Sequence, residues 1–290
     1  MTATWTPPRP ADRRPAPAAN PPSGPGLDRS DIPMPLPGRP LWTIAGTVMV
    51  VGALGWGAFN VIDLLAHGET TEDQTFAAED VSTISIDNDN GRVVVIGTDT
   101  DVISLHAEIS HGLRDTGFDW EVVDGVLEIE GHCPLFGSYW CDVDYRLEVP
   151  NDVDVLVSSD NDRVYVSDIA GNVQINADNG RVELVRLSGT VHAETDNGRL
   201  EGDGLSSDSV TAMSDNGRVE LDFVDAPSFV RAETDNGSIE IALPDVDGGY
   251  NVDTQTDNGS EDVAILDNPS STRTVDAETD NGSITVRPIG

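Results

Sequence analysis

One phrase, a valine followed five residues later by Asp-Asn-Gly, recurs through the chain and limits what it can fold into. A representative copy reads Val191-His-Ala-Glu-Thr-Asp-Asn-Gly198. After the first copy, neighbouring copies lie 18 to 23 residues apart, a spacing typical of a stacked structural repeat. The asparagines of the eight copies are Asn90, Asn161, Asn179, Asn197, Asn216, Asn236, Asn258 and Asn281.

Apolar and polar residues alternate on both sides of each Asp-Asn-Gly, which predicts strand, tight turn, strand in every copy. The glycine is expected to supply the positive φ that such a turn requires. Two arrangements fit this pattern. Each copy is an antiparallel hairpin, or each copy is one coil of a β-solenoid whose equivalent positions share one core.

We favour the solenoid, because a lone hairpin cannot bury its apolar face. Small residues such as Ala193, Ala212 and Ala232 occupy one inward position, as a narrow interior demands. Glu261 replaces the valine, leucine or isoleucine of the other copies, so local irregularity is expected there. The fold class is therefore all-β, a β-solenoid or β-helix-like repeat domain with about 18–23 residues per coil.

Composition divides the chain before the repeats. Residues 1–40 hold twelve of the eighteen prolines and are expected to form a disordered tail. Residues 41–62 carry no charge and can span a bilayer as one helix, which needs about 20 residues. A cleaved signal peptide is the competing interpretation. The apolar run is too long for one, however, and the segment before it is longer than the short basic region of a signal peptide. Residues 63–80 are expected to be a linker.

Charge predicts the orientation of that helix. The tail holds five arginines against three aspartates, whereas the other side begins with Asp63, Glu69, Glu72 and Asp73. The positive-inside rule places the tail in the cytoplasm and the repeats outside the cell membrane.

Residues 81–150 are β-rich but irregular, with a hairpin expected at Asp124-Gly125. They are interpreted as an N-terminal cap on the solenoid, residues 151–290.

The chain is strongly acidic, with a net charge of −36 and no lysine. Nothing in such a chain would neutralise phosphates, which excludes nucleic acid as a partner. A divalent cation or a basic polymer is compatible with this charge, and so is a simple role in solubility.

The aspartate of the repeated phrase is the sharpest candidate site. If the coils stack in register, Asp178, Asp196, Asp215 and Asp235 line one edge and offer oxygen ligands of the kind Ca²⁺ prefers. The alternative is that aspartate caps the turn and asparagine adopts the left-handed conformation. No cofactor other than Ca²⁺ is expected.

The arginines that follow the turns are expected to form a ladder against the edge of aspartates: Arg92, Arg163, Arg181, Arg199 and Arg218.

Cys133 and Cys141 are the only cysteines, and an oxidising compartment makes a disulfide between them the expected state. It would fix the aromatic loop of residues 135–140, either as a contact surface or packed against the end of the solenoid. The five histidines form no metal-binding spacing, and neither a nucleophile elbow nor a phosphate loop is present. The chain is therefore not expected to be an enzyme, although a carboxylate pair acting on polysaccharide is an alternative.

The run Asp144-Tyr-Arg-Leu-Glu-Val-Pro150, the run Val153–Val157 and the repeated Gly-x-Val-x-x-x-Thr-Asp-Asn-Gly resemble a bacterial family known as putative adhesins. The resemblance covers residues 80–288 and implies a membrane-attached β-repeat domain shown on the cell surface. It implies no catalytic residues. The expected function is an adhesin-like binding or scaffold module for a protein or polysaccharide of the cell envelope or surface. A cation-responsive envelope sensor is the alternative.

Overall fold

A computed structural model of the chain describes residues 39–65, 67–112, 116–134, 140–161 and 163–289. Almost all of the predicted tail lies outside these ranges, as do residues 135–139 of the aromatic loop. The chain divides into two compact units, Met1–Ala53 and Leu54–Gly290.

Helix α1 spans Arg39–Leu65, a few residues beyond the predicted 41–62 at each end. Within it, Ala45–Ile62 is long and apolar enough to cross a membrane, and none of this window is buried. Length and composition alone support a membrane anchor, and a signal sequence meets the same test.

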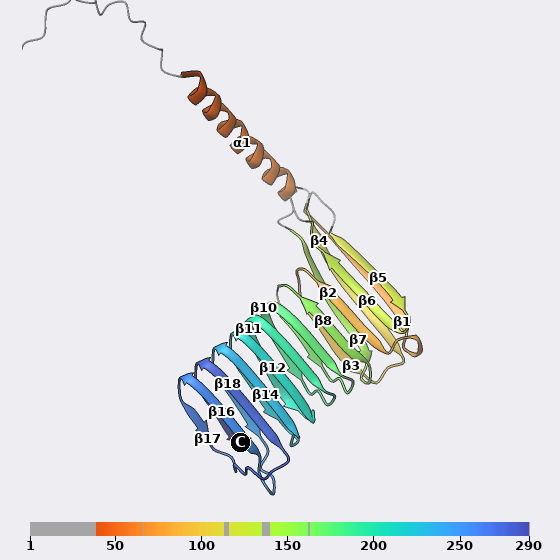
Figure 1. The fold of residues 1–290 in the computed structure, drawn as a ribbon. Helices are drawn as coiled ribbons and strands as arrows, with labels where there is room; N and C mark the ends of the chain where they lie inside the picture. The colour runs from red at the N-terminus through yellow and green to blue at the C-terminus, as the bar shows by residue number, and fades with distance from the viewer. Residues whose placement is uncertain (1–38, 66, 113–115, 135–139, 162, 290) are drawn as a thin grey trace, which may run out of the picture. The chain divides into compact units, whose positions relative to one another are not determined.

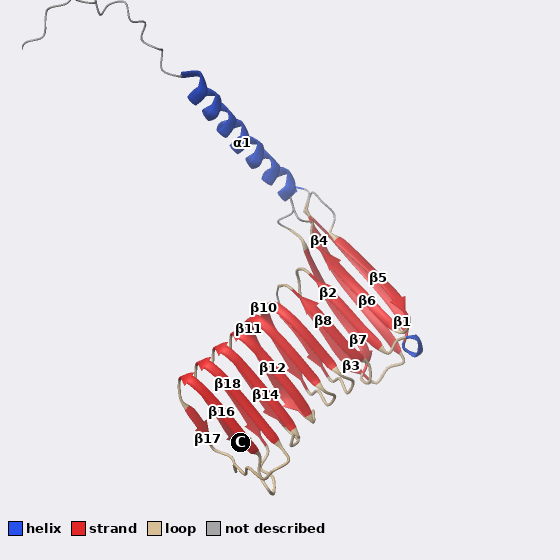
Figure 2. Cartoon of the chain, in the orientation of Figure 1, coloured by secondary structure: helices blue, strands red, loops and turns tan. Residues whose placement is uncertain are grey.

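Apart from a short 3₁₀ helix, η2 (Ala78–Asp80), the regular structure of the rest of the described chain consists of β-strands, which form a large mixed sheet (Figures 1 and 2). Its strand pairs follow two ladders. Ladder A contains the strands that precede the Asp-Asn-Gly turns. In spatial order its strands are β5 (Gly117–Val123), β6 (Val126–His132), β2 (Thr83–Asn88), β8 (Asp154–Ser159), the first half of β10 (Val173–Val185), the first half of β11 (Val191–Leu205), β12 (Ser209–Asn216), β14 (Phe229–Asn236), β18 (Thr274–Asn281) and β16 (Asn251–Asn258).

Ladder B contains the strands that follow the turns. β10 and β11 run through their turns and so belong to both ladders. The spatial order of ladder B is β1 (Gly68–Ala77), β4 (Val102–His111), β7 (Asp142–Pro150), β3 (Val93–Thr98), β9 (Arg163–Ser167), the second halves of β10 and β11, β13 (Val219–Phe223), β15 (Ile239–Leu243), β19 (Ile284–Pro288) and β17 (Glu261–Val263).

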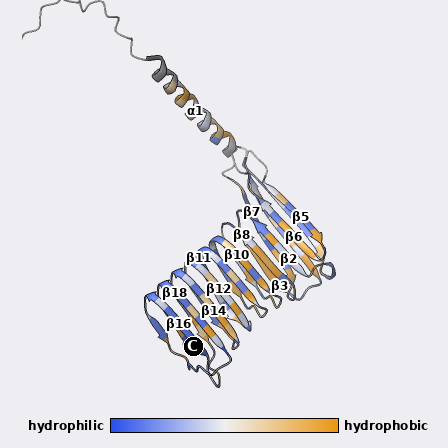
Figure 3. Ribbon diagram, viewed as in Figure 1, coloured by the Kyte–Doolittle hydropathy of each residue, from blue (hydrophilic) through white to orange (hydrophobic). Residues whose placement is uncertain are grey.

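The two ladders enclose one core, because inward and outward side chains alternate along each strand. β12 and β13, for example, bury every second residue, including Val210, Ala212, Val219 and Leu221. Buried residues from both ladders belong to a single hydrophobic cluster. Figure 3 shows the resulting alternation of hydrophilic and hydrophobic residues along the strands.

Copies of the repeat pair with one another in parallel and in register. Val191 lies beside Val210, Val210 beside Val230, and Val230 beside Val275. The antiparallel pairs are β1 with β4, β4 with β7, and β5 with β6, all near the N-terminal end of the ladders. The hairpin alternative for the repeated copies is therefore wrong.

The last two copies are stacked out of chain order, which the sequence did not predict. The Asn281 copy (β18 and β19) pairs with β14 and β15, and the Asn258 copy (β16 and β17) pairs outside it. Figure 1 shows β16 beyond β18 at this end of ladder A. The final copy of the sequence is thus inserted between two copies that precede it.

The composition of the Asn258 copy explains its end position. Two of its inward residues are polar, Thr254 and Glu261, and the Thr254 hydroxyl donates a 2.9 Å hydrogen bond to the Glu261 carboxylate. In the Asn281 copy the equivalent residues are Ala277 and Ile284, both buried. A polar copy can close the core only where one side faces water, since a buried unpaired carboxylate is costly. The irregularity predicted at Glu261 is therefore an end cap.

The N-terminal region differs from the expected linker and cap. Residues 68–77, predicted to be part of a linker, form β1, which pairs along its whole length with β4. The Asn90 copy (β2 and β3) is a member of the stack, because it pairs in parallel with β8 and β9. The hairpin predicted at Asp124-Gly125 is confirmed by β5 and β6, and both turn residues have positive φ. Phe76 and Trp120 meet edge to face at 4.9 Å between β1 and β5.

Candidate functional site

The Asp-Asn-Gly turns of the stacked copies form a continuous ridge, here named the turn ridge. Parallel pairing in register brings Asn179 beside Asn197, Asn197 beside Asn216, and Asn236 beside Asn281. The ridge therefore carries an aspartate, an asparagine and a glycine column side by side.

The asparagine column is a hydrogen-bonded ladder. From Asn179 onward, each asparagine donates its side-chain amide to the side-chain oxygen of the asparagine in the adjacent copy. The donor–acceptor pairs are Asn179 to Asn161 (3.4 Å), Asn197 to Asn179 (3.2 Å), Asn216 to Asn197 (3.2 Å), Asn236 to Asn216 (3.0 Å), Asn281 to Asn236 (3.1 Å) and Asn258 to Asn281 (3.1 Å). Sequence reasoning missed this ladder, although the same residue type in all eight copies was a signal for it.

The glycine column has a different role from the one predicted. Gly91 and Gly180 do have positive φ, but Gly198, Gly217 and Gly237 lie outside the left-handed region. A Cβ atom at Gly217 would overlap the carbonyl oxygen of Gly198, and one at Gly237 would overlap that of Gly217. Glycine is required at most of these turns because neighbouring backbones approach closely, not because of its φ.

The alternative to a Ca²⁺ site was that the aspartate caps the turn and the asparagine adopts the left-handed conformation. The part that concerns asparagine is wrong. In the described chain, the non-glycine residues with positive φ are Asp124, Asp168 and Arg186, so the ladder asparagines are not left-handed. Threonine hydroxyls instead donate to the turn glycine of the adjacent copy. Thr234 donates to the Gly217 carbonyl at 3.1 Å, and Thr279 donates to that of Gly237 at 3.2 Å.

The aspartate column lies exposed beside the asparagine ladder. Asp196, Asp215 and Asp235 line one open pocket of about 190 Å³, together with Glu194 and Glu233. Thr195, Ser214 and Met213 complete its lining, and Asp178 lies outside it. The structure thus brings three of the four predicted carboxylates together.

The two glutamates of this pocket have partners. Glu194 lies 3.1 Å from His192, and Glu233 lies 2.8 Å from Arg231. In the part of the chain that the structure describes, the side chains of Asp196, Asp215 and Asp235 make no hydrogen bond or ion pair. Among the same residues, no group of three or more acidic, histidine or cysteine side chains is arranged to hold a metal ion. The Ca²⁺ site at these aspartates stays a prediction.

Like-charge crowding is visible where the ridge begins. Burial raises the pKa of the Asp160 carboxyl above its usual value, and Asp178, Asp89 and Asp87 raise it further. At Asp160 the neighbouring carboxylates therefore disfavour ionisation, an effect that a cation bound there would relieve.

The predicted arginine ladder exists, but its partners are glutamates on ladder B and not the turn aspartates. Arg181 lies 3.2 Å from Glu183 and 3.8 Å from Glu201, and Arg199 lies 2.9 Å from Glu201. Arg218 lies 4.0 Å from Glu220. Ladder B therefore has partial charge compensation that the turn ridge lacks.

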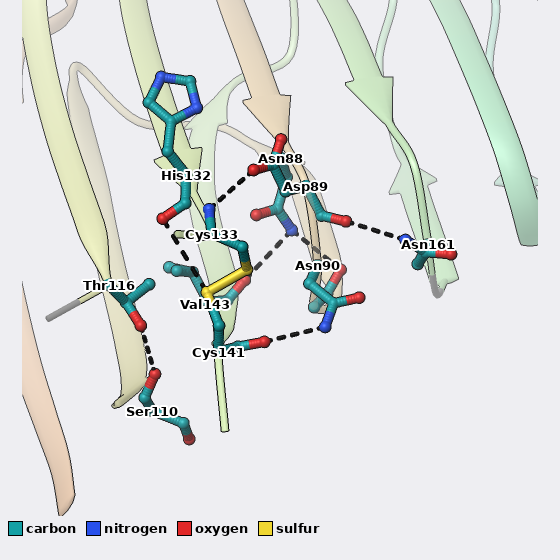
Figure 4. Close-up of a disulfide and its surroundings, with 11 residues drawn as sticks. Asn88, Asp89, Asn90, Ser110, Thr116, His132, Cys133, Cys141, Val143 and Asn161 are labelled. Carbon is teal, nitrogen blue, oxygen red and sulfur yellow. Dashed lines mark hydrogen bonds between the residues drawn. A yellow bond between two sulfur atoms is a disulfide. The ribbon is translucent and has the colours of Figure 1, made fainter. Parts of the chain in front are cut away.

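Cys133 and Cys141 are joined by a disulfide, with Cα atoms 5.6 Å apart. Figure 4 shows how the disulfide segment is tied to the ridge. The Cys133 amide donates to the Asp89 carboxylate at 2.7 Å, and the Asn90 side chain donates to the Cys141 carbonyl at 2.8 Å. Asn161 donates to the backbone carbonyl of Asp89 at 3.1 Å, which links this segment to the next copy.

Most of the aromatic loop next to the disulfide lies outside the described residues. Trp140, its last member, is 40% exposed, and its ring lies 4.7 Å from that of His67. The contact surface and the packing against the stack both stay predictions for this loop.

Comparisons with known proteins come from solved structures. A putative adhesin from Parabacteroides merdae is 13% identical, covering 76% of this chain and 97% of its own, with a TM-score of 0.41. A putative cell adhesion protein from Clostridium sporogenes is 8% identical, covering 77% and 100%, with a TM-score of 0.38. A putative lipid binding protein from Parabacteroides distasonis is 14% identical, covering 76% and 97%, with a TM-score of 0.26.

The first two names agree with the family that the sequence resembles. No family model matches the chain, and no curated protein matches it.

Proposed function

We propose that the protein is a single-pass membrane protein with an N-terminal cytoplasmic tail, whose β region forms a β-solenoid outside the membrane. In this proposal the solenoid is a binding or scaffold module for a protein or polysaccharide of the cell envelope or surface. The observation that carries it is the in-register pairing of stacked copies, which repeats the Asp-Asn-Gly turn along one edge of the stack. The apolar window of α1 supports the membrane span, and the tail arginines and the Cys133–Cys141 disulfide support the placement of the β region outside the membrane.

Topology is tested by treating intact cells that express the full chain with a protease. We expect the β region to be cut while a tag on the N-terminus stays protected. Protection of the β region, or release of the chain from the membrane fraction by processing of α1, would contradict the proposal.

Ligand binding is tested with the full chain in lipid nanodiscs, using isolated envelope polysaccharides and envelope proteins as probes. A triple variant, Asp196→Asn, Asp215→Asn and Asp235→Asn, removes three carboxylates from the turn ridge. The matched control, Glu183→Gln, Glu201→Gln and Glu220→Gln, removes three from ladder B. If only the triple aspartate variant binds more weakly than the wild-type chain, the ligand binds at the turn ridge. If both variants change the affinity equally, the ligand binds elsewhere.

A second candidate is a cation-responsive envelope sensor. The observation that favours it is the pocket where Asp196, Asp215 and Asp235 converge without cationic partners among the described residues. A cation that binds only the folded state raises the melting temperature with its concentration. We expect Ca²⁺ to stabilise the full chain but not the triple aspartate variant. An unchanged midpoint in the wild-type chain would remove this candidate.

We further propose that the protein has no catalytic activity. What supports this is the absence of a nucleophile elbow, a phosphate loop and a metal-binding histidine spacing from the sequence. Release of reducing ends from envelope polysaccharides by the full chain would contradict it.

A further inference from the structure

Three copies of the repeat contain the same pentapeptide, Thr-Asp-Asn-Gly-Ser. It occupies residues 234–238, 256–260 and 279–283. An asparagine followed by glycine is chemically labile, because glycine has no side chain to hinder attack by its backbone nitrogen on the asparagine amide. The three pentapeptides should share one intrinsic reactivity, so any difference between them must come from their places in the stack.

Two of these asparagines lie inside the ladder and are held on both sides. Asn236 donates to Asn216 at 3.0 Å and accepts from Asn281 at 3.1 Å. Asn281 donates to Asn236 and accepts from Asn258 at 3.1 Å.

The attacking nitrogens of these interior copies are held as well. The Gly237 amide donates to the Asn281 carbonyl at 3.0 Å, and the Gly282 amide donates to the Asn258 carbonyl at 3.1 Å. Attack on the asparagine side chain would require both groups to leave their hydrogen bonds.

Asn258 lies at the open end of the ladder because its copy is the outermost one. Its amide donates to Asn281 at 3.1 Å, but within the described chain its side-chain oxygen accepts no hydrogen bond. The Gly259 amide likewise has no partner there, unlike those of Gly237 and Gly282. Both Asn258 and Gly259 are exposed.

The Asn90 turn near the other end of the stack is better protected. The Asn90 amide donates to the Cys141 carbonyl at 2.8 Å, and Gly91 is buried against Asp142 and Val143. Asn258 is therefore the least restrained asparagine–glycine pair among those that the structure describes.

We propose that Asn258 is a site of spontaneous modification, where the folded protein deamidates first. The Gly259 nitrogen forms a bond to Cγ of Asn258, the bond from Cγ to Nδ2 breaks, and Nδ2 leaves as ammonia with the proton of the Gly259 amide. One water molecule then opens the five-membered imide to aspartate or isoaspartate. The net change is one water consumed and one ammonia released.

Aspartate or isoaspartate at residue 258 weakens the attachment of the outermost copy, which caps the stack. A carboxylate at residue 258 cannot donate to Asn281, and it adds a charge beside Asp257. Isoaspartate also lengthens the backbone by one carbon between β16 and β17, which disturbs the register of β17 on β19. The stack would then lose its outermost copy before any other.

The experiment follows deamidation of the purified full chain in detergent at 37 °C and mildly alkaline pH, with each site resolved by peptide mass mapping. We expect Asn258 to react about tenfold faster than Asn236 or Asn281, a ratio equivalent to about 1.4 kcal/mol. In urea, where the stack is lost, the three sites should react at one rate.

Equal rates in the folded chain, or a faster reaction at Asn236 or Asn281, would overturn the proposal. So would a faster reaction at Asn258 in urea, since the cause would then be local sequence. Asn281→Ala removes the remaining partner of the Asn258 amide and should accelerate the reaction at Asn258. Asn197→Ala, which removes the same kind of bonds far from this end, should not.

Discussion

The Asn258 copy and the Asn281 copy have the same turn and neighbouring places in the sequence, but they differ in what surrounds them. The Asn281 copy has a copy on each side and buries Ala277 and Ile284. The Asn258 copy has a neighbour on one side and presents Thr254 and Glu261 to the end of the core. The comparison teaches that inward polarity, and not chain order, decides which copy closes the stack.

The largest expected effect comes from the glycine column. Gly237→Ala would place a Cβ against the Gly217 carbonyl in the interior of the stack, and we expect a loss of about 4–5 kcal/mol in the free energy of unfolding. Gly259→Ala makes the same clash with the Gly282 carbonyl, but only the end copy has to move away. Chemical denaturation measures both. Equal losses would mean that the Asn258 copy is as constrained as the interior.

Exchanging inward residues between the two copies should have the next largest effect. Ile284→Glu buries an unpaired carboxylate and should cost about 3–5 kcal/mol. Glu261→Ile should cost little stability but leaves an apolar sheet edge, so we expect self-association. Denaturation and light scattering of the full chain check these outcomes. A severe loss of stability in Glu261→Ile would contradict the end-cap role.

The asparagine ladder offers a smaller contrast. Asn216→Ala removes two side-chain hydrogen bonds and should cost about 1–2 kcal/mol, whereas Asn258→Ala removes one and should cost about 0.5–1 kcal/mol. Thermal melts of the two variants, measured side by side, test this. If Asn258→Ala proves the more damaging, the ladder does not weaken toward its end.

The smallest effect concerns the pKa of Asp160, which burial and neighbouring aspartates raise. The Asp160 carboxyl therefore binds a proton more readily in the folded state than in the unfolded state. The free energy of unfolding should rise as the pH falls through the raised pKa toward the usual value of 3.8. Asp160→Asn should stabilise the chain at neutral pH, and this advantage should shrink in acid.

Melting curves between neutral and acidic pH measure the difference, with Asp247→Asn in an exposed loop as the control. An advantage of Asp160→Asn that does not change with pH would show that charge crowding is not its cause.

The sequence by itself determined the strands of the repeated copies, the positions of their turns and their period, because alternating polarity and repeated spacing are local properties of the chain. It also located Glu261 as the irregular position and Asp124-Gly125 as a hairpin. Only the tertiary structure decided that Asn258 lies outside Asn281, that asparagines bond from copy to copy, and that arginines pair with ladder B glutamates. These features depend on which surfaces lie next to each other in space. The spatial order follows from which copy can leave polar residues at the end of a shared apolar core, and no single copy contains that information.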